Sequence, residues 1–164
     1  MQNVSSFGGP RVLLPTSDVK RWMDELGDAP TPDEGLYGLA CSIDAYCGVI
    51  APWETPLLIF GDDPADIYFK PDEFDGLFFR WVGADSLEQL TAFAIVEAHG
   101  DEWDETVEFT VVTPDMTLMD TCALADDGEP RIRLNLRIGT YEINSRFAES
   151  DEVMAIIHRL TYVG

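Results

Sequence analysis

The segment at residues 131–138 alternates strictly between polar and apolar side chains, and this pattern constrains the fold more than any other. It reads Arg-Ile-Arg-Leu-Asn-Leu-Arg-Ile. Successive side chains of a β-strand point to opposite faces, so the segment predicts a strand that buries one face and leaves its arginines in water. The residues expected to point inward are Ile132, Leu134, Leu136 and Ile138. The chain therefore contains a sheet with one face in a core.

Much of the remaining chain consists of short β-branched or aromatic runs separated by turn residues at intervals of roughly ten, which is typical of antiparallel sheets. In the run at 140–147 we expect Tyr141, Ile143 and Phe147 to point inward. The other expected strands are Val12–Leu14, Tyr37–Ile43, Cys47–Ala51, Leu57–Phe60, Ile67–Phe69, Leu77–Val82, Val107–Val111, Met116–Met119 and Glu152–Val163.

Two segments carry the signals of short amphipathic helices. In the first, Ser17 can cap the amino end and Gly27 can end the helix. In the second, Asp85 or Ser86 can cap, and the inward stripe comprises Leu87, Leu90, Phe93 and Ala94. The sequence thus predicts an α+β, mainly β fold, namely an antiparallel β-sandwich or strongly bent sheet with two short helices.

Length and composition predict one domain, over residues 1–164. The chain has the size of an ordinary domain, and 46% of its residues are hydrophobic, enough for one core. No apolar run approaches the ~18–20 residues of a membrane span, and no signal peptide is recognisable. Three cysteines without CxxC spacing, Cys41, Cys47 and Cys122, fit a reducing compartment, so we expect a cytoplasmic protein without a membrane partner.

Charge narrows the classes of partner. Thirty-one acids against ten bases give a formal net charge of −21 at pH 7. Such a field repels nucleic acids and favours basic protein surfaces. The charge is concentrated: residues 31–75 carry a net −9, residues 101–130 a net −10, and residues 131–164 a net +1. We therefore expect a basic protein partner and no nucleic acid.

The acids lie largely in expected turns and are interleaved with aromatic residues. This mixture is typical of interface hot spots on electrostatically steered surfaces, although an acidic face can also serve solubility alone. Loops commonly carry binding residues. The candidate partner-binding residues are Asp62, Asp63, Asp66, Asp72, Glu73, Asp75, Asp101, Glu102, Trp103, Asp104, Glu105, Asp126, Asp127 and Glu129.

Catalytic constellations are hard to assemble from this chain, so we expect no enzyme, no cofactor and no metal site. The two histidines, His99 and His158, stand at an expected helix end and in an apolar strand, and no GxSxG, HExxH or paired CxxC motif occurs. Arg80 is interpreted as a buried arginine, paired with an acid or stacked on a ring. A carboxylate-based hydrolase is the alternative; it would need two acids about 5–9.5 Å apart in one pocket, at least one with a perturbed pKa.

Taken together and in order, landmarks along nearly the whole chain resemble the immunity protein 21 family. The resemblance implies a small cytoplasmic antidote, encoded beside a polymorphic or contact-delivered bacterial toxin that it binds and silences without an active site. It assigns no contact residues. A regulatory module that masks some other basic protein is a further alternative. The landmarks are Gly8–Pro10 with Val12–Pro15, Trp22, Tyr37–Cys41, Tyr46 with Gly48–Ile50, Leu58–Pro64, Gly76 with Phe78 and Arg80–Trp81, Gly139–Ile143, and Ile157–Leu160.

Overall fold

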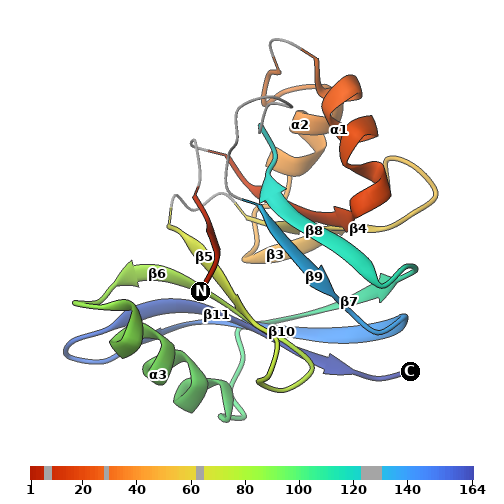
Figure 1. Ribbon diagram of the computed structural model, residues 1–164. Coiled ribbons are helices and arrows are strands. Elements are labelled where there is room, and N and C mark those ends of the chain that lie inside the picture. Colours follow the sequence, from red (N-terminus) through yellow and green to blue (C-terminus); the bar gives the residue numbers. More distant parts are fainter. Residues whose placement is uncertain (6–8, 28–29, 62–64, 123–130) are drawn as a thin grey trace.

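The computed structural model describes residues 1–5, 9–27, 30–61, 65–122 and 131–164. Its strands form two antiparallel sheets that face each other (Figure 1). Sheet A has the order β1 (Asn3–Val4), β5 (Ile67–Lys70), β6 (Leu77–Gly83), β11 (Met154–Tyr162), β10 (Gly139–Glu149) and β7 (Glu105–Val111). Sheet B has the order β3 (Cys47–Ile50), β4 (Leu57–Phe60), β2 (Arg11–Pro15), β8 (Asp115–Asp120) and β9 (Ile132–Asn135). The predicted mainly β fold with antiparallel sheets is confirmed.

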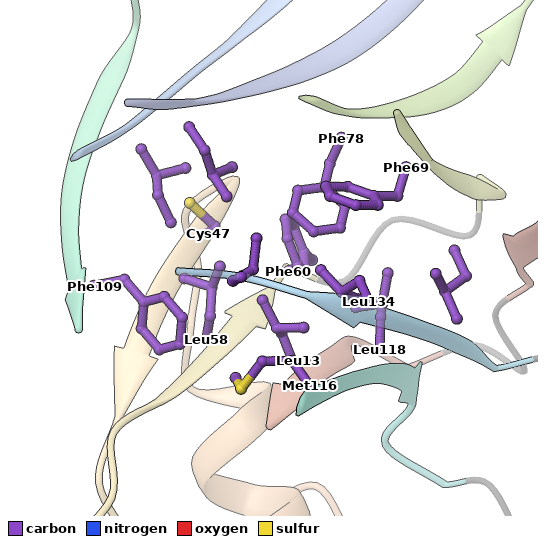
Figure 2. Packing of buried hydrophobic residues seen from close by; sticks show 14 of the residues in the cluster. Leu13, Cys47, Leu58, Phe60, Phe69, Phe78, Phe109, Met116, Leu118 and Leu134 are labelled. Carbon is purple, nitrogen blue, oxygen red and sulfur yellow. The ribbon is translucent and has the colours of Figure 1, made fainter. Parts of the chain in front are cut away.

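The main core lies between the two sheets, where alternate residues of each strand point inward (Figure 2). β4 shows how the sequence produces this arrangement. Leu58 and Phe60 face sheet A, while Leu57 and Ile59 face the helices on the other side, so all four residues of the strand are buried. A strand covered on both faces is a continuous apolar run rather than an alternating one.

Helices cover the outer face of each sheet. α1 (Val19–Leu26) follows a 3₁₀ turn at Thr16–Asp18 and packs with α2 (Gly35–Cys41) on sheet B. α3 (Leu87–Ala98) packs on sheet A, at the opposite side of the molecule (Figure 1). Two predicted helix ends are confirmed: Ser86 Oγ accepts the Gln89 N–H at 3.1 Å, and Gly27 ends α1 with φ +81°. The cap predicted at Ser17 is wrong, because Ser17 lies within the 3₁₀ turn, and Asp18, the residue before α1, makes no side-chain capping hydrogen bond. The layers are therefore α1 and α2, sheet B, sheet A, and α3.

The strand predicted at Tyr37–Ile43 is wrong, because this segment contains helix α2. A short apolar run bounded by turn residues favoured a strand, but such runs do not discriminate well between the two structures. The burial instead follows Leu36 and Ala40, which stand four residues apart and pack together in the cluster beneath α1. The fold therefore contains three α-helices among its described residues, where the sequence predicted two.

Two residues predicted to point inward are exposed. Phe147 is 37% exposed because β10 has 11 residues and the strands of sheet B have 4 to 6, so its far end extends beyond the opposing sheet. Ile138 is 56% exposed because β9 ends at Asn135 while the polar–apolar alternation of the sequence continues. The other predicted inward residues of these segments, Ile132, Leu134, Leu136, Tyr141 and Ile143, are buried.

A buried polar network connects the two sheets. Arg80 on β6 is 1% exposed and donates to the carbonyl oxygens of Gly61 at 2.9 Å and Tyr46 at 2.7 Å. Its Nε donates to Nε2 of His158 at 3.2 Å, and the other ring nitrogen lies 2.7 Å from Ser145 Oγ. The prediction of Arg80 as a buried arginine is confirmed, and the network fixes the 46–61 region of sheet B against sheet A.

Candidate partner-binding surface

Two acidic segments that are far apart in the sequence meet at the carboxyl end of α3. The first is the β5–β6 turn at residues 71–76, and the second is the α3–β7 connection at residues 99–104. The ring centroids of Phe74 and His99 lie 4.9 Å apart, which joins the two segments directly. We call their combined surface the acidic collar, which comprises Asp72, Glu73, Phe74, Asp75, His99, Asp101, Glu102, Trp103 and Asp104.

Arg159 of β11 holds the acidic collar together from below. Its guanidinium carbon lies 4.7 Å from the ring centroid of Trp103 and 5.5 Å from that of Phe74. The same group donates to the carbonyl oxygens of Ala98 at 2.9 Å and Gly100 at 3.5 Å, where α3 ends. A cation at the carboxyl end of a helix satisfies carbonyls that have no partner within the helix. Arg159 therefore positions both aromatic rings of the collar.

Arg146 of β10 provides a second anchor. Its guanidinium forms an ion pair with Glu97 of α3 and donates to the carbonyl oxygen of Glu102 at 3.3 Å. Trp103 packs against the apolar cluster beneath α3, with the Arg146 guanidinium 6.0 Å from its ring centroid. The α3–β7 connection is consequently fixed at both its backbone and its aromatic side chain.

Phe74 has a backbone φ of +57°, in the left-handed region that bulky residues rarely adopt. This conformation costs a non-glycine residue about 1–2 kcal/mol. The surroundings retain it because the ring packs against His99, at an interplanar angle of 54°, and against the Arg159 guanidinium. Backbone strain of this kind is often found at functional sites.

The acids of the collar differ in their local partners. Lys70 Nζ donates to Asp72 at 3.0 Å, and this hydrogen bond lowers the pKa of Asp72. Asp75 accepts the Tyr162 N–H at 2.8 Å, and Asp104 accepts the Phe147 N–H at 3.2 Å. Asp101 and Glu102 are exposed, and Glu73 is half-buried with its carbonyl accepting the Gly76 N–H. The collar thus presents carboxylates around two aromatic rings.

Two candidate residues lie outside the collar. Asp66 accepts a hydrogen bond from Asn3 Nδ2 at 3.0 Å, next to the pairing of β1 with β5. Both carboxylate oxygens of Glu105 accept the Tyr46 N–H, at 3.0 and 3.1 Å. Their geometry assigns both residues a structural task. The remaining candidates, Asp62, Asp63, Asp126, Asp127 and Glu129, lie outside the described residues.

One concave pocket bears on the carboxylate-hydrolase alternative. It has a volume of about 460 Å³ and includes two acids, Asp44 and Glu105, beside Arg80. Glu105 is engaged with the Tyr46 backbone, as described above, so it acts here as a clamp on the 44–46 loop. The described residues contain no cluster of three or more metal-ligating side chains, and none of the helices described is long and apolar enough to cross a membrane.

Sequence reasoning identified most acids of the collar but not its organisation. Arg159 was placed in a strand without a role, and nothing local indicates that residues 74 and 99 touch. The available signal was the strand alternation of β11, which sends Arg159 to the same face as Ile157 and Ala155, under α3. Combined with the acidic connection that follows α3, it could have suggested an arginine beneath this surface.

Comparison with known proteins agrees with the landmarks of the sequence. No curated protein and no solved structure matches the chain. The family model described as Immunity protein 21 matches residues 2–154. The matched residues include both segments of the acidic collar, whereas Arg159 lies beyond them. A match over this length covers sheet B, all three helices described above and every strand of sheet A except β11, of which it reaches only the first residue. The chain therefore belongs to the immunity protein 21 family.

Proposed function

We propose that the chain binds a cognate protein toxin and neutralises it by occlusion, with the acidic collar docked on a basic active-site cleft such as that of a nuclease. Family membership supports the role of an immunity protein. A site built for phosphates offers lysines and arginines, and carboxylates are their natural partners. The net charge of −21 steers such a partner toward the collar before contact.

The observation that carries the proposal is the convergence of two acidic segments around Phe74, Trp103 and Arg159. Acidic residues that serve only solubility do not need other residues to hold them in one arrangement. Here an arginine and a strained backbone position keep aromatic rings among carboxylates, which combines the anchors and the charged rim of a protein interface. Binding requires no catalytic group of its own.

The test is a double charge reversal, Asp101→Lys with Glu102→Lys, measured against the toxin domain encoded beside the gene of this chain. Both side chains are exposed, so the fold should tolerate the change. The matched control is Asp33→Lys with Glu34→Lys, an exposed acidic pair ahead of α2, on the opposite side of the molecule (Figure 1). Both variants change the net charge by the same amount.

We expect the collar variant to lose at least about tenfold in affinity and to protect cells poorly, while the control stays within about threefold of the wild type. Equal losses in the two variants would show that total charge matters and that the collar does not. Unchanged binding in both would contradict docking through the collar.

A further inference from the structure

Helix α3 is apolar over most of its circumference, and its outer side carries exposed Glu88 only in the first turn, ahead of Ala92 and Val96. Its twelve residues, Leu-Glu-Gln-Leu-Thr-Ala-Phe-Ala-Ile-Val-Glu-Ala, include two charged side chains, Glu88 and Glu97. Leu90, Ala94 and Ala98 face sheet A and are fully buried. A helix on the surface of a protein normally carries polar residues on its outer face, whereas an apolar outer face is typical of a helix that is covered on both sides.

The outer face of α3 is nevertheless exposed in the isolated chain. Val96 is 68% exposed, the most exposed large apolar side chain in the described part of the molecule. Ala92, one turn earlier, is exposed, and Phe93 and Ile95 on the flanks are half-buried. Figure 1 shows α3 at the outside of sheet A, with no other described element over it. Contiguous exposed apolar patches are common at protein interaction sites.

The outer face of α3 leads directly into the acidic collar. Ala92, Val96 and His99 follow one another at intervals of four and three residues, so they share one side of the helix. The His99 ring packs at a tilt against Phe74, which is itself 38% exposed. The result is a continuous line of apolar and aromatic groups that ends among carboxylates. Protein interfaces have this anatomy, with an apolar centre and a charged rim.

We infer that the outer face of α3, with Val96 at its centre, forms the apolar core of the toxin interface, and that it fits a surface that presents apolar side chains flanked by lysines or arginines. This inference rests on the proposed function and specifies the partner of the same site. The toxin fits this face better than a second copy of the chain does, because two copies would bring two acidic collars and two net charges of −21 together. Charge complementarity favours a basic occupant.

The experiment compares Val96→Lys with Val112→Lys in titrations against the toxin domain encoded beside the gene. Val112 is a matched control, since it is 48% exposed and directly follows β7, at the end of the strand away from Trp103. Both variants add one positive charge, and neither replaces a buried side chain. A third variant, Val96→Ser, removes the apolar group without adding charge.

We expect Val96→Lys and Val96→Ser to raise the dissociation constant about tenfold or more, and Val112→Lys to leave it within about twofold. If the wild type binds the toxin but Val96→Lys and Val112→Lys change the dissociation constant equally, the inference is overturned. A wild-type dimer that Val96→Lys converts to a monomer would assign the face to a second copy and would overturn it too. Failure of the wild type to bind the toxin at all would contradict the proposed function itself.

Discussion

Arg80 donates its Nε hydrogen to Nε2 of His158 across 3.2 Å, within the buried space between the sheets. A guanidinium group can only donate, so Nε2 of the histidine must accept and the ring must be neutral. Its proton then stands on Nδ1 and is donated to Ser145 Oγ at 2.7 Å. Burial first, and then the charges of Arg80 and Arg11, hold the pKa of His158 well below its usual value.

This depressed pKa makes stability fall in acid. Below about pH 6.5 the unfolded chain binds a proton at His158 that the folded protein refuses, so the free energy of unfolding should fall by up to about 1.4 kcal/mol per pH unit. His158→Gln is the control, because an amide can accept from Arg80 and donate to Ser145 without titrating. Urea unfolding at pH 7.5, 6.0 and 5.0 should show the wild type losing stability relative to H158Q. Parallel profiles would contradict this role of the ring.

Gly61 stands where sheet B approaches the 44–46 loop, and the structure leaves no room for a side chain there. A Cβ atom would lie 2.2 Å from the carbonyl oxygen of Ala45. Gly61→Ala should therefore cost about 1–3 kcal/mol of stability, because backbone must move. Gly48→Ala in β3 is the comparison, since its Cβ would meet the flexible end of Ile43 at 2.8 Å. Urea midpoints should rank Gly61→Ala well below Gly48→Ala.

The positive φ of Phe74 predicts that glycine at this position gives a more stable protein than alanine, the reverse of the usual order. Both Phe74→Ala and Phe74→Gly remove the ring, but only alanine keeps the cost of the left-handed backbone. The glycine variant should be the more stable by about 1 kcal/mol in urea unfolding. At Asp72, an exposed neighbour with no positive φ, the usual order with alanine above glycine is expected. The same order at both positions would show that Phe74 carries no strain.

Electrostatic steering predicts that toxin association depends on ionic strength. Raising salt from about 20 to 500 mM shortens the Debye length from over 20 Å to under 5 Å, which should slow association about tenfold or more. Dissociation should change less, because the contacts that determine it are short-range. Stopped-flow mixing with the toxin domain measures both rates. In the Asp101→Lys, Glu102→Lys variant the dependence of the association rate on salt should be weaker, and a salt-independent rate in the wild type would exclude steering.

Much of the sheet structure could be predicted because each strand carries its own signal. The alternation in β9 and β10 and the turn residues between β4 and β6 identify strands without knowledge of the fold. Predictions were wrong where burial depends on distant elements. Leu36 and Ala40 are helical because α1 and sheet B offer them a common face, and Phe147 is exposed because the opposing sheet is too short.

The types of residue in the candidate surface were predictable from the sequence, but their arrangement in space was not. The acids and Trp103 stand in turns that the sequence indicates, but the contact between Phe74 and His99 joins residues 25 positions apart and depends on how α3 lies on sheet A. Glu105 looked like its acidic neighbours in sequence, yet it clamps the Tyr46 backbone. The outer face of α3 left a clear signal in its apolar composition, since the inward stripe accounts for only part of it.

In the proposed interface, the position of α3 outside the sandwich separates recognition from folding. Ala92 and Val96 contribute little to the clusters that hold the sheets together, because the buried side of the helix is made by Leu90, Ala94 and Ala98. Substitutions on the outer side can therefore accumulate with small effects on stability. A lineage that meets a new toxin variant can change its specificity there, one exposed side chain at a time, while the scaffold beneath stays the same.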